Sequence, residues 1–208
     1  MSAPVKTDHT LERLVFFSDA VFAIAITLLV LEIKVPVLPK GSPDAAYWQA
    51  LHLLAPSFAS YFISFAVVGI FWIAHHRAFA LAGRYSGRIL GWNMGLLGVI
   101  AFMPFASAFD AQNLDQRVPS LVYCGTLLVA SLLNIAVVHI ATGAGMRAEG
   151  ADPARVRYVR GRSLAVALGA GTALILSWYT PQWGQLGMLT IIVWRRLLTR
   201  GAAAAQSP

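Results

Sequence analysis

The 208-residue sequence is poor in charge and nearly free of cysteine. Only 12% of its residues are charged, where soluble domains typically carry about a quarter, and 58% are hydrophobic. The single cysteine, Cys124, cannot form a disulfide within the chain, and its apolar surroundings predict a small buried residue. The shortage of charge argues against a soluble domain and indicates an integral membrane protein.

Catalytic and phosphate-binding motifs are missing as well. The chain contains no H-x-x-E-H, G-x-S-x-G, C-x-x-C or phosphate-loop pattern. His75 and His76 are adjacent, but no cysteine or carboxylate lies near them in the sequence to complete a metal site. We therefore expect neither an enzyme nor a resident cofactor or metal.

Long apolar runs fill the chain instead. A spanning helix needs about 20 apolar residues, and six such runs with short loops account for almost the whole length. The predicted spans are residues 14–33, 48–75, 89–109, 120–142, 163–179 and 186–198. The sixth is short, and it crosses the membrane only if Arg195 and Arg196 extend their side chains to the interface. The sequence thus predicts one all-α membrane domain over residues 1–200 and a disordered tail at 201–208.

Basic residues outnumber acidic ones, and the net charge is +7. They concentrate in the loops between apolar runs, which favours membrane topology over nucleic-acid binding as their cause. With six spans, both termini share a side with the second and fourth loops. Of the 16 lysine and arginine residues, all but Lys34, Lys40 and Arg117 fall on that side. The positive-inside rule then predicts a multi-pass protein of the cell membrane with both termini in the cytoplasm.

The first predicted span begins with polar residues at a depth where charge is costly. Arg13 opens the stretch, and Ser18 and Asp19 follow within it. An ionisable group inside the bilayer costs about 2.5–3.5 kcal/mol on insertion scales, so it is kept where it is paired or reaches water. His75 and His76, at the matching end of the second span, are the expected partners of Asp19 in an interhelical network. The alternative is an Asp19 side chain solvated among the headgroups.

The later part of the same span carries an apolar stripe. Ile24, Leu28 and Leu31 lie on one side of the helix because they are spaced by four and by three. Thr27 flanks them. Spacing alone favours packing or lipid contact for such a stripe.

Two amides fall in the middle of predicted spans. Asn93 and Asn134 predict interhelical hydrogen bonds of about 1 kcal/mol each, because hydrocarbon offers an amide no partner. They indicate helix packing.

The opening of the first span matches a known signature. Residues 13–19 read R-x-x-x-F-S-D, and the likeness continues through "AVFAIAITLLVLEIKVP" and, in the second span, "FWIAHHR". The pattern resembles the transmembrane protein 175 family of potassium channels, found in endolysosomes and in prokaryotes. The resemblance implies a structural role for Arg13, Phe17, Ser18 and Asp19, which would tie the first helix to its neighbours. In the other four spans the resemblance is one of architecture.

The resemblance also implies an assembly and a pore. Four copies of the chain would form a homotetramer in the lipid bilayer, with the first helix of each lining a central path for potassium ions. Ile24, Leu28 and Leu31 would form the constriction, and Thr27 would contribute a hydroxyl to the potassium preference. As in the family, no T-V-G-Y-G filter is present.

An apolar ring around a narrow axis can gate an ion path by dewetting. An ion must shed or squeeze its hydration to pass, which modestly favours potassium over the more strongly hydrated sodium. We therefore expect passive potassium conduction. A proton-coupled or proton-conducting protein, with Asp19, His75 and His76 as a relay, is one alternative. A non-conducting membrane scaffold, with the first helix as its assembly seam, is another.

Overall fold

Helices make up the regular structure of this chain. The computed structural model describes residues 9–203, and the side chains of residues 9–199. The elements are α1 (His9–Leu31), α2 (Asp44–Leu53), α3 (Ala55–Phe79), α4 (Gly87–Ala111), α5 (Arg117–Ala141), α6 (Pro153–Tyr179), the 3-10 segment η1 (Pro181–Thr190) and α7 (Ile191–Ala203). Within residues 9–203 there is no β-strand, and one isolated bridge between Ala82 and Arg147 joins two loops. The all-α prediction is confirmed.

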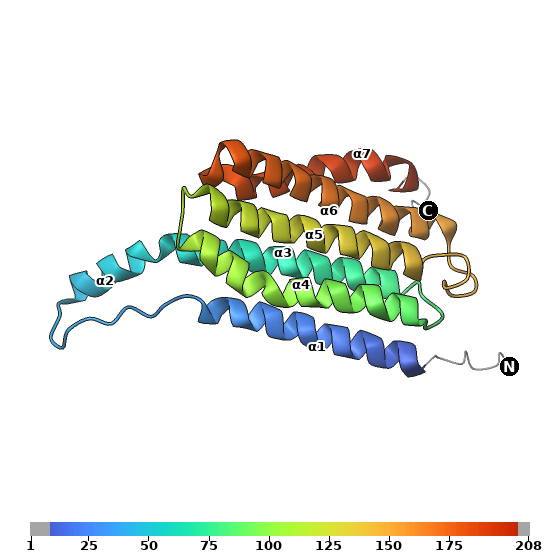
Figure 1. Cartoon of the computed structure of the whole chain (residues 1–208), viewed down its shortest axis with the longest axis horizontal. Coiled ribbons are helices and arrows are strands. Elements are labelled where there is room, and N and C mark those ends of the chain that lie inside the picture. The colour runs from blue at the N-terminus through green and yellow to red at the C-terminus, as the bar shows by residue number, and fades with distance from the viewer. Residues whose placement is uncertain (1–8, 204–208) are drawn as a thin grey trace.

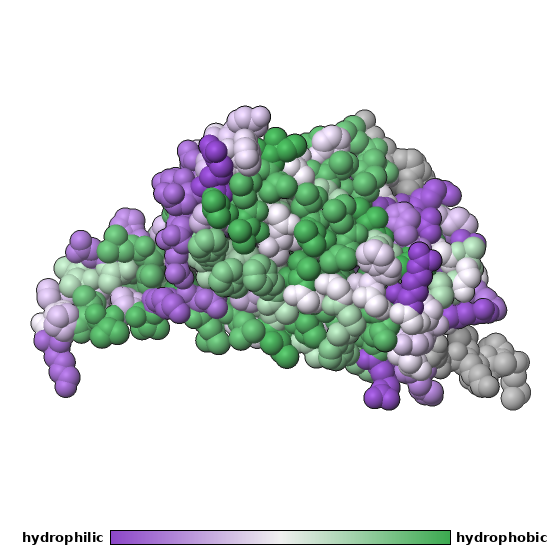
Figure 2. Space-filling view, in the orientation of Figure 1, coloured by the Kyte–Doolittle hydropathy of each residue, from purple (hydrophilic) through white to green (hydrophobic). Residues whose placement is uncertain are grey.

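Five of the helices are long and apolar enough to cross a membrane. They are α1, α3, α4, α5 and α6, with 23 to 27 residues and mean hydropathies from 1.3 to 2.5 in their most apolar stretches. They lie side by side, with α1 along one edge of the bundle and α6 with α7 along the opposite edge (Figure 1). Hydrophobic surface covers the middle of the bundle, and hydrophilic side chains gather toward both ends (Figure 2). We call the end where α1 begins the near end, and the end where α1 finishes the far end.

The second predicted span, residues 48–75, is divided in the structure. α2 ends at Leu53 and α3 begins at Ala55, with Pro56 in the first turn of α3. Proline has no backbone N–H to donate to the preceding turn, so a continuous helix is interrupted here. α2 has no buried residue and extends away from the bundle at the far end (Figure 1). The helix that is long and apolar enough to cross a membrane therefore begins at Ala55.

The sixth predicted span, residues 186–198, falls across two elements. η1 and α7 run back along α6 as one composite segment (Figure 1). The 10 residues of η1 and the 13 of α7 would each cover about 20 Å, since a 3-10 helix rises about 2.0 Å per residue and an α-helix about 1.5 Å. Together they cover about 40 Å, enough to cross the roughly 30 Å hydrocarbon core, whereas α7 alone is too short. α7 continues to Ala203, so the predicted tail is helical at its start, and residues 204–208 lie outside the described part of the chain.

Glycines let η1 approach α6 and α5 closely. A Cβ on Gly187 would collide with the backbone of Ala173 on α6, and a Cβ on Gly184 would collide with the Ser177 hydroxyl. Side chains then fasten the segment, because Gln185 donates to the carboxylate of Asp110 on α4. Close backbone packing of this kind is common where small residues meet in membrane helices.

Substituting Gly187 with alanine tests this contact. The added methyl group has no room against the α6 backbone, and overpacking of this kind costs about 1–3 kcal/mol. We expect a clear fall in the thermal unfolding temperature of the purified protein in detergent. Gly171→Ala is the matched control, because nothing lies within 4 Å of a Cβ at that position on α6. Equal unfolding temperatures for the two variants would contradict the close packing.

Candidate functional site

α1 has one buried face and one exposed face. Its buried residues are Leu11, Leu14, Ser18, Phe22, Ala25 and Leu29, spaced by three and four and packed against α3 and α4. The residues predicted to form the constriction all lie on the uncovered side. Ile24 is 57% exposed, Leu28 40% and Leu31 69%. Thr27 is exposed beside them, and its hydroxyl donates to the Ile24 carbonyl at 2.9 Å. The predicted stripe is thus available for contact with something outside the single chain.

A chain of hydrogen bonds fixes the other face of α1. Nδ2 of Asn93 on α4 donates to the Ser18 hydroxyl at 2.9 Å, and the hydroxyl donates to the Leu14 carbonyl at 2.8 Å. His75 on α3 meets Oδ1 of Asn93 at 2.8 Å. Ser18, His75 and Asn93 are all 0% exposed. Polar groups bonded to one another in an apolar interior resist separation, so this series of hydrogen bonds holds α1 against α3 and α4.

Asp19 is tied to the second span, but through a different residue from the ones predicted. Its carboxylate accepts from the indole Nε1 of Trp72 at 2.8 Å. His76 packs against Trp72, with 5.8 Å between ring centroids. His75 is hydrogen-bonded to Asn93, and its ring also lies 5.5 Å from the ring of Phe22 on α1, centroid to centroid. The direct Asp19–histidine pair is not formed in this structure. The interhelical bond at this depth is the one between Trp72 and Asp19.

Trp72 is the residue that sequence reasoning missed here. A tryptophan near the end of a span is typical of an interface belt, so the sequence alone does not indicate that Trp72 donates a hydrogen bond to another helix. Its indole N–H needs a partner when the ring lies against protein. Trp72 lies one helical turn before His76, so the two side chains share a face of the helix. That spacing was the signal in the sequence that Trp72 could reach Asp19. The mid-span amide of Asn93 does make the predicted interhelical bonds.

Arg13 and Phe17 behave differently from the rest of the motif. Both are exposed, and Phe17 is on the same side of α1 as the apolar stripe. Among residues 9–199, no hydrogen bond, ion pair or ring contact joins either side chain to another helix. Of the four motif residues, Ser18 and Asp19 are therefore the two that hydrogen-bond to neighbouring helices within one chain.

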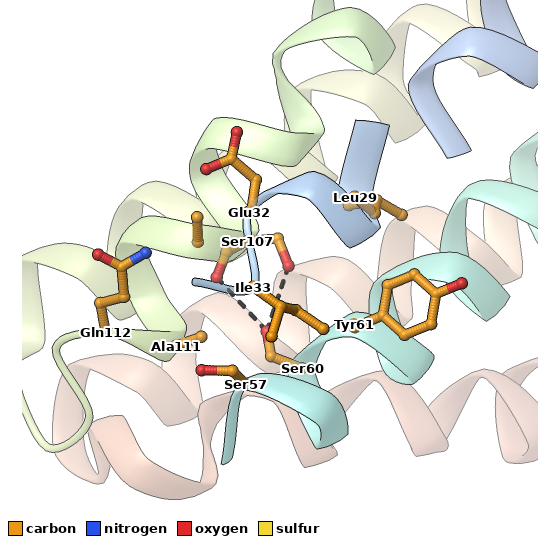
Figure 3. Close-up of a pocket in the computed structure, with 10 residues that line it drawn as sticks. Leu29, Glu32, Ile33, Ser57, Ser60, Tyr61, Ser107, Ala111 and Gln112 are labelled. Carbon is orange, nitrogen blue, oxygen red and sulfur yellow. Dashed lines mark hydrogen bonds between the residues drawn. The ribbon is translucent and has the colours of Figure 1, made fainter. Parts of the chain in front are cut away.

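A small polar pocket lies beside the last turn of α1 at the far end. Its lining includes Glu32, Ser57, Ser60, Ser107 and Gln112. Ser60 and Ser107 point toward each other across α3 and α4, whereas Glu32 points away from them (Figure 3). Within the described residues, no group of three or more histidine, cysteine or acidic side chains is placed to hold a metal ion. The pocket offers hydroxyl and amide groups beside Leu29, on the buried face of α1.

These features define a polytopic helical membrane protein whose first helix is anchored on one face and leaves an apolar stripe free on the other. A family model described as "Endosomal/lysosomal potassium channel TMEM175" matches residues 13–104, which hold the whole anchoring network. A potassium channel of Streptomyces collinus is 35% identical over 173 residues, covering 78% of this chain and 82% of that protein. The chain belongs to the TMEM175 family, and the resemblance read from its first span is confirmed.

A solved structure extends the likeness to the full fold. It is a lysosomal potassium-selective channel TMEM175 homolog from Chamaesiphon minutus, 30% identical, with a TM-score of 0.73. The match covers 94% of this chain and 99% of that one. The human protein named "Endosomal/lysosomal proton channel TMEM175" is 36% identical over 136 residues, covering 61% of this chain but only 27% of its own length. Relatives of this chain thus carry the names of both potassium and proton channels.

Removing the Ser18 hydroxyl tests the anchor. Ser18→Ala leaves a buried N–H of Asn93 without its acceptor, which costs about 1–3 kcal/mol. We expect a lower unfolding temperature in detergent. Ser131→Ala is the control, because Ser131 is equally buried and also bonds the carbonyl four residues back, but has no partner on another helix within residues 9–199. If both variants lose the same stability, the Asn93 bond does not anchor α1.

Proposed function

We propose that the chain forms a homotetrameric channel of the cell membrane that conducts potassium ions passively. The observation that carries the proposal is the exposed stripe of Ile24, Leu28 and Leu31 on a helix whose opposite face is fixed by hydrogen bonds. The names of the bacterial relatives supply the ion. No catalytic step is part of this function.

The geometry of α1 suits a pore lining. Ile24 and Leu31 are two turns apart and point within about 20° of each other, so that copies of α1 around an axis would form stacked rings. Such rings would be apolar and free of charge. A constriction of this kind blocks ions by dewetting when narrow and passes them when it widens slightly.

Thr27 adds a polar atom to this apolar path. Its hydroxyl proton is used in the bond to the Ile24 carbonyl, which leaves the oxygen lone pairs free to face away from the helix. Four such oxygens at one level would offer partial replacement of an ion's hydration shell. That would favour potassium, which gives up water more readily than sodium.

The charge distribution supports an orientation in which the near end is cytoplasmic. Among the lysine and arginine residues between 9 and 199, only Lys34, Lys40 and Arg117 lie at the far end. Both termini would then be cytoplasmic, and the pocket beside Glu32 would open on the outer side.

Proton conduction is the second candidate, favoured by the name of the human relative. Asp19, His75 and His76 would be its relay, and they lie together at the near end rather than along the membrane thickness. The proton reading predicts flux driven by a pH gradient and lost in Asp19→Asn with folding intact. The potassium reading predicts flux without any proton gradient.

Ion uptake into proteoliposomes of the purified protein separates these readings. We expect potassium uptake that exceeds sodium uptake and persists when a protonophore clamps the pH gradient to zero. Uptake that requires a proton gradient would favour the second candidate. An assembled, folded protein with no uptake of either ion would leave a scaffold as the function.

Shortening Leu31 tests the constriction. Leu31→Ala is expected to raise potassium uptake or to relax the preference over sodium, by about tenfold for each ~1.4 kcal/mol removed from the barrier. Val30→Ala is the control, because Val30 is also exposed on α1 but lies about 100° around the helix from Leu31. Equal uptake by Leu31→Ala, Val30→Ala and the parent chain would refute the pore assignment.

Thiol labelling in intact cells tests the orientation. The only native cysteine, Cys124, is 0% exposed and serves as the blank. We expect a membrane-impermeant maleimide to label Leu114→Cys, in the exposed turn after α4, without lysis. Glu149→Cys, in the exposed linker before α6, should be labelled only after permeabilisation. The reverse pattern would place the near end outside the cell.

A further inference from the structure

The hydrogen-bond chain behind α1 has a direction. Ser18 donates its proton to the Leu14 carbonyl, so its oxygen is the acceptor for Nδ2 of Asn93. With Nδ2 as the donor, Oδ1 of Asn93 is the acceptor for Nε2–H of His75. A neutral His75 then carries its proton on Nε2, and its Nδ1 is an acceptor that requires a donor.

Two buried side chains have complementary needs. Nδ1 of His75 has no hydrogen-bond partner among the described residues, and neither amide atom of Asn134 on α5 has one. Both residues are 0% exposed. A buried polar group left without a bond costs about 1–3 kcal/mol, and a hydrocarbon interior supplies no bulk water to repair it. His75 needs a donor, and the Asn134 amide offers one.

The register of α3 and α5 places these residues at one depth. The two helices run in the same direction, and Ser64 on α3 bonds the Tyr123 hydroxyl on α5 at 3.1 Å. His75 and Asn134 lie equally far along their helices from that pair, three turns and about 20°. His75 therefore lies on the same face of α3 as Ser64, and Asn134 lies on the same face of α5 as Tyr123.

A second contact, between α4 and α5, gives the same relative depth independently. On α4, a Cβ at Gly95 would meet the Leu133 side chain of α5 at 3.7 Å. Asn93 is two residues before Gly95 on α4, and Asn134 directly follows Leu133 on the antiparallel α5. The amides of Asn93 and Asn134 thus lie at nearly the same level, with His75 bonded to the first of them.

We propose that a buried water molecule bridges His75 and Asn134. The water accepts from Nδ2 of Asn134 and donates to Nδ1 of His75, and its second proton can reach Oδ1 of the same amide. A buried water typically needs two to four polar partners, and these three atoms supply them. The bridge extends the chain that begins at Ser18 on α1, through α4 and α3, to α5. Asn134 is thereby a positioning residue for the first helix, whichever ion the protein conducts.

Nitrogen-15 NMR of the histidine rings in the full-length protein tests the bridge. The Nδ1 resonance of His75, assigned by its loss in His75→Gln, is expected to be shifted upfield as in a hydrogen-bonded acceptor. It should also receive magnetisation from the protons of water. In Asn134→Leu, an apolar substitution of similar shape, the resonance should move downfield and the water contact should be lost.

Ser131→Ala is the control for a buried polar change one turn away on α5, because Ser131 bonds only the carbonyl of its own helix among the described contacts. It should leave the His75 resonance unchanged. A free-acceptor resonance in the parent protein overturns the proposal. So does an upfield resonance without water contact, which would mean a direct bond to Asn134. If Asn134→Leu fails to fold, these two observations on the parent protein decide the question alone.

Discussion

A membrane interior offers buried polar groups no water to hydrogen-bond with, and the placement of α1 follows from that constraint. Ser18, Asn93 and His75 are hydrogen-bonded in series across three helices, with bonds of 2.8 to 2.9 Å. Breaking any of these bonds would leave a polar group unpaired in an apolar medium. The first helix is therefore held against α3 and α4, near its own middle, by hydrogen bonds that nothing in the apolar surroundings can replace.

The anchored face determines what the other face can do. Because Ser18 points inward, the helical period turns Ile24, Thr27, Leu28 and Leu31 outward along the second half of α1. An apolar stripe that faced only lipid would need no such fixed orientation. A stripe that meets copies of itself around an axis needs its angle held closely, since a small rotation would move the ring side chains off the axis. The hydrogen bonds on one face of α1 therefore set the orientation of the apolar stripe on the other face.

Much of this arrangement could be predicted from the sequence. Apolar length located the long helices, and the motif from Arg13 to Asp19 identified the family, because a serine and a carboxylate inside an apolar run are rare and specific. The partner of Asp19 could not be predicted, because Trp72 is equally suited to an interface belt. The break before Ala55 and the 3-10 segment depend on tertiary contacts, such as Gly187 against α6, that no local pattern reveals.

The central claim is that the free stripe of α1 meets its own copies on an axis. Electron cryo-microscopy of the protein in lipid nanodiscs tests this most directly. The account predicts four copies around a central path, with α1 innermost and the Ile24 and Leu31 side chains pointing at the axis. An assembly built around another helix, or separate chains whose α1 stripe faces lipid, would contradict it.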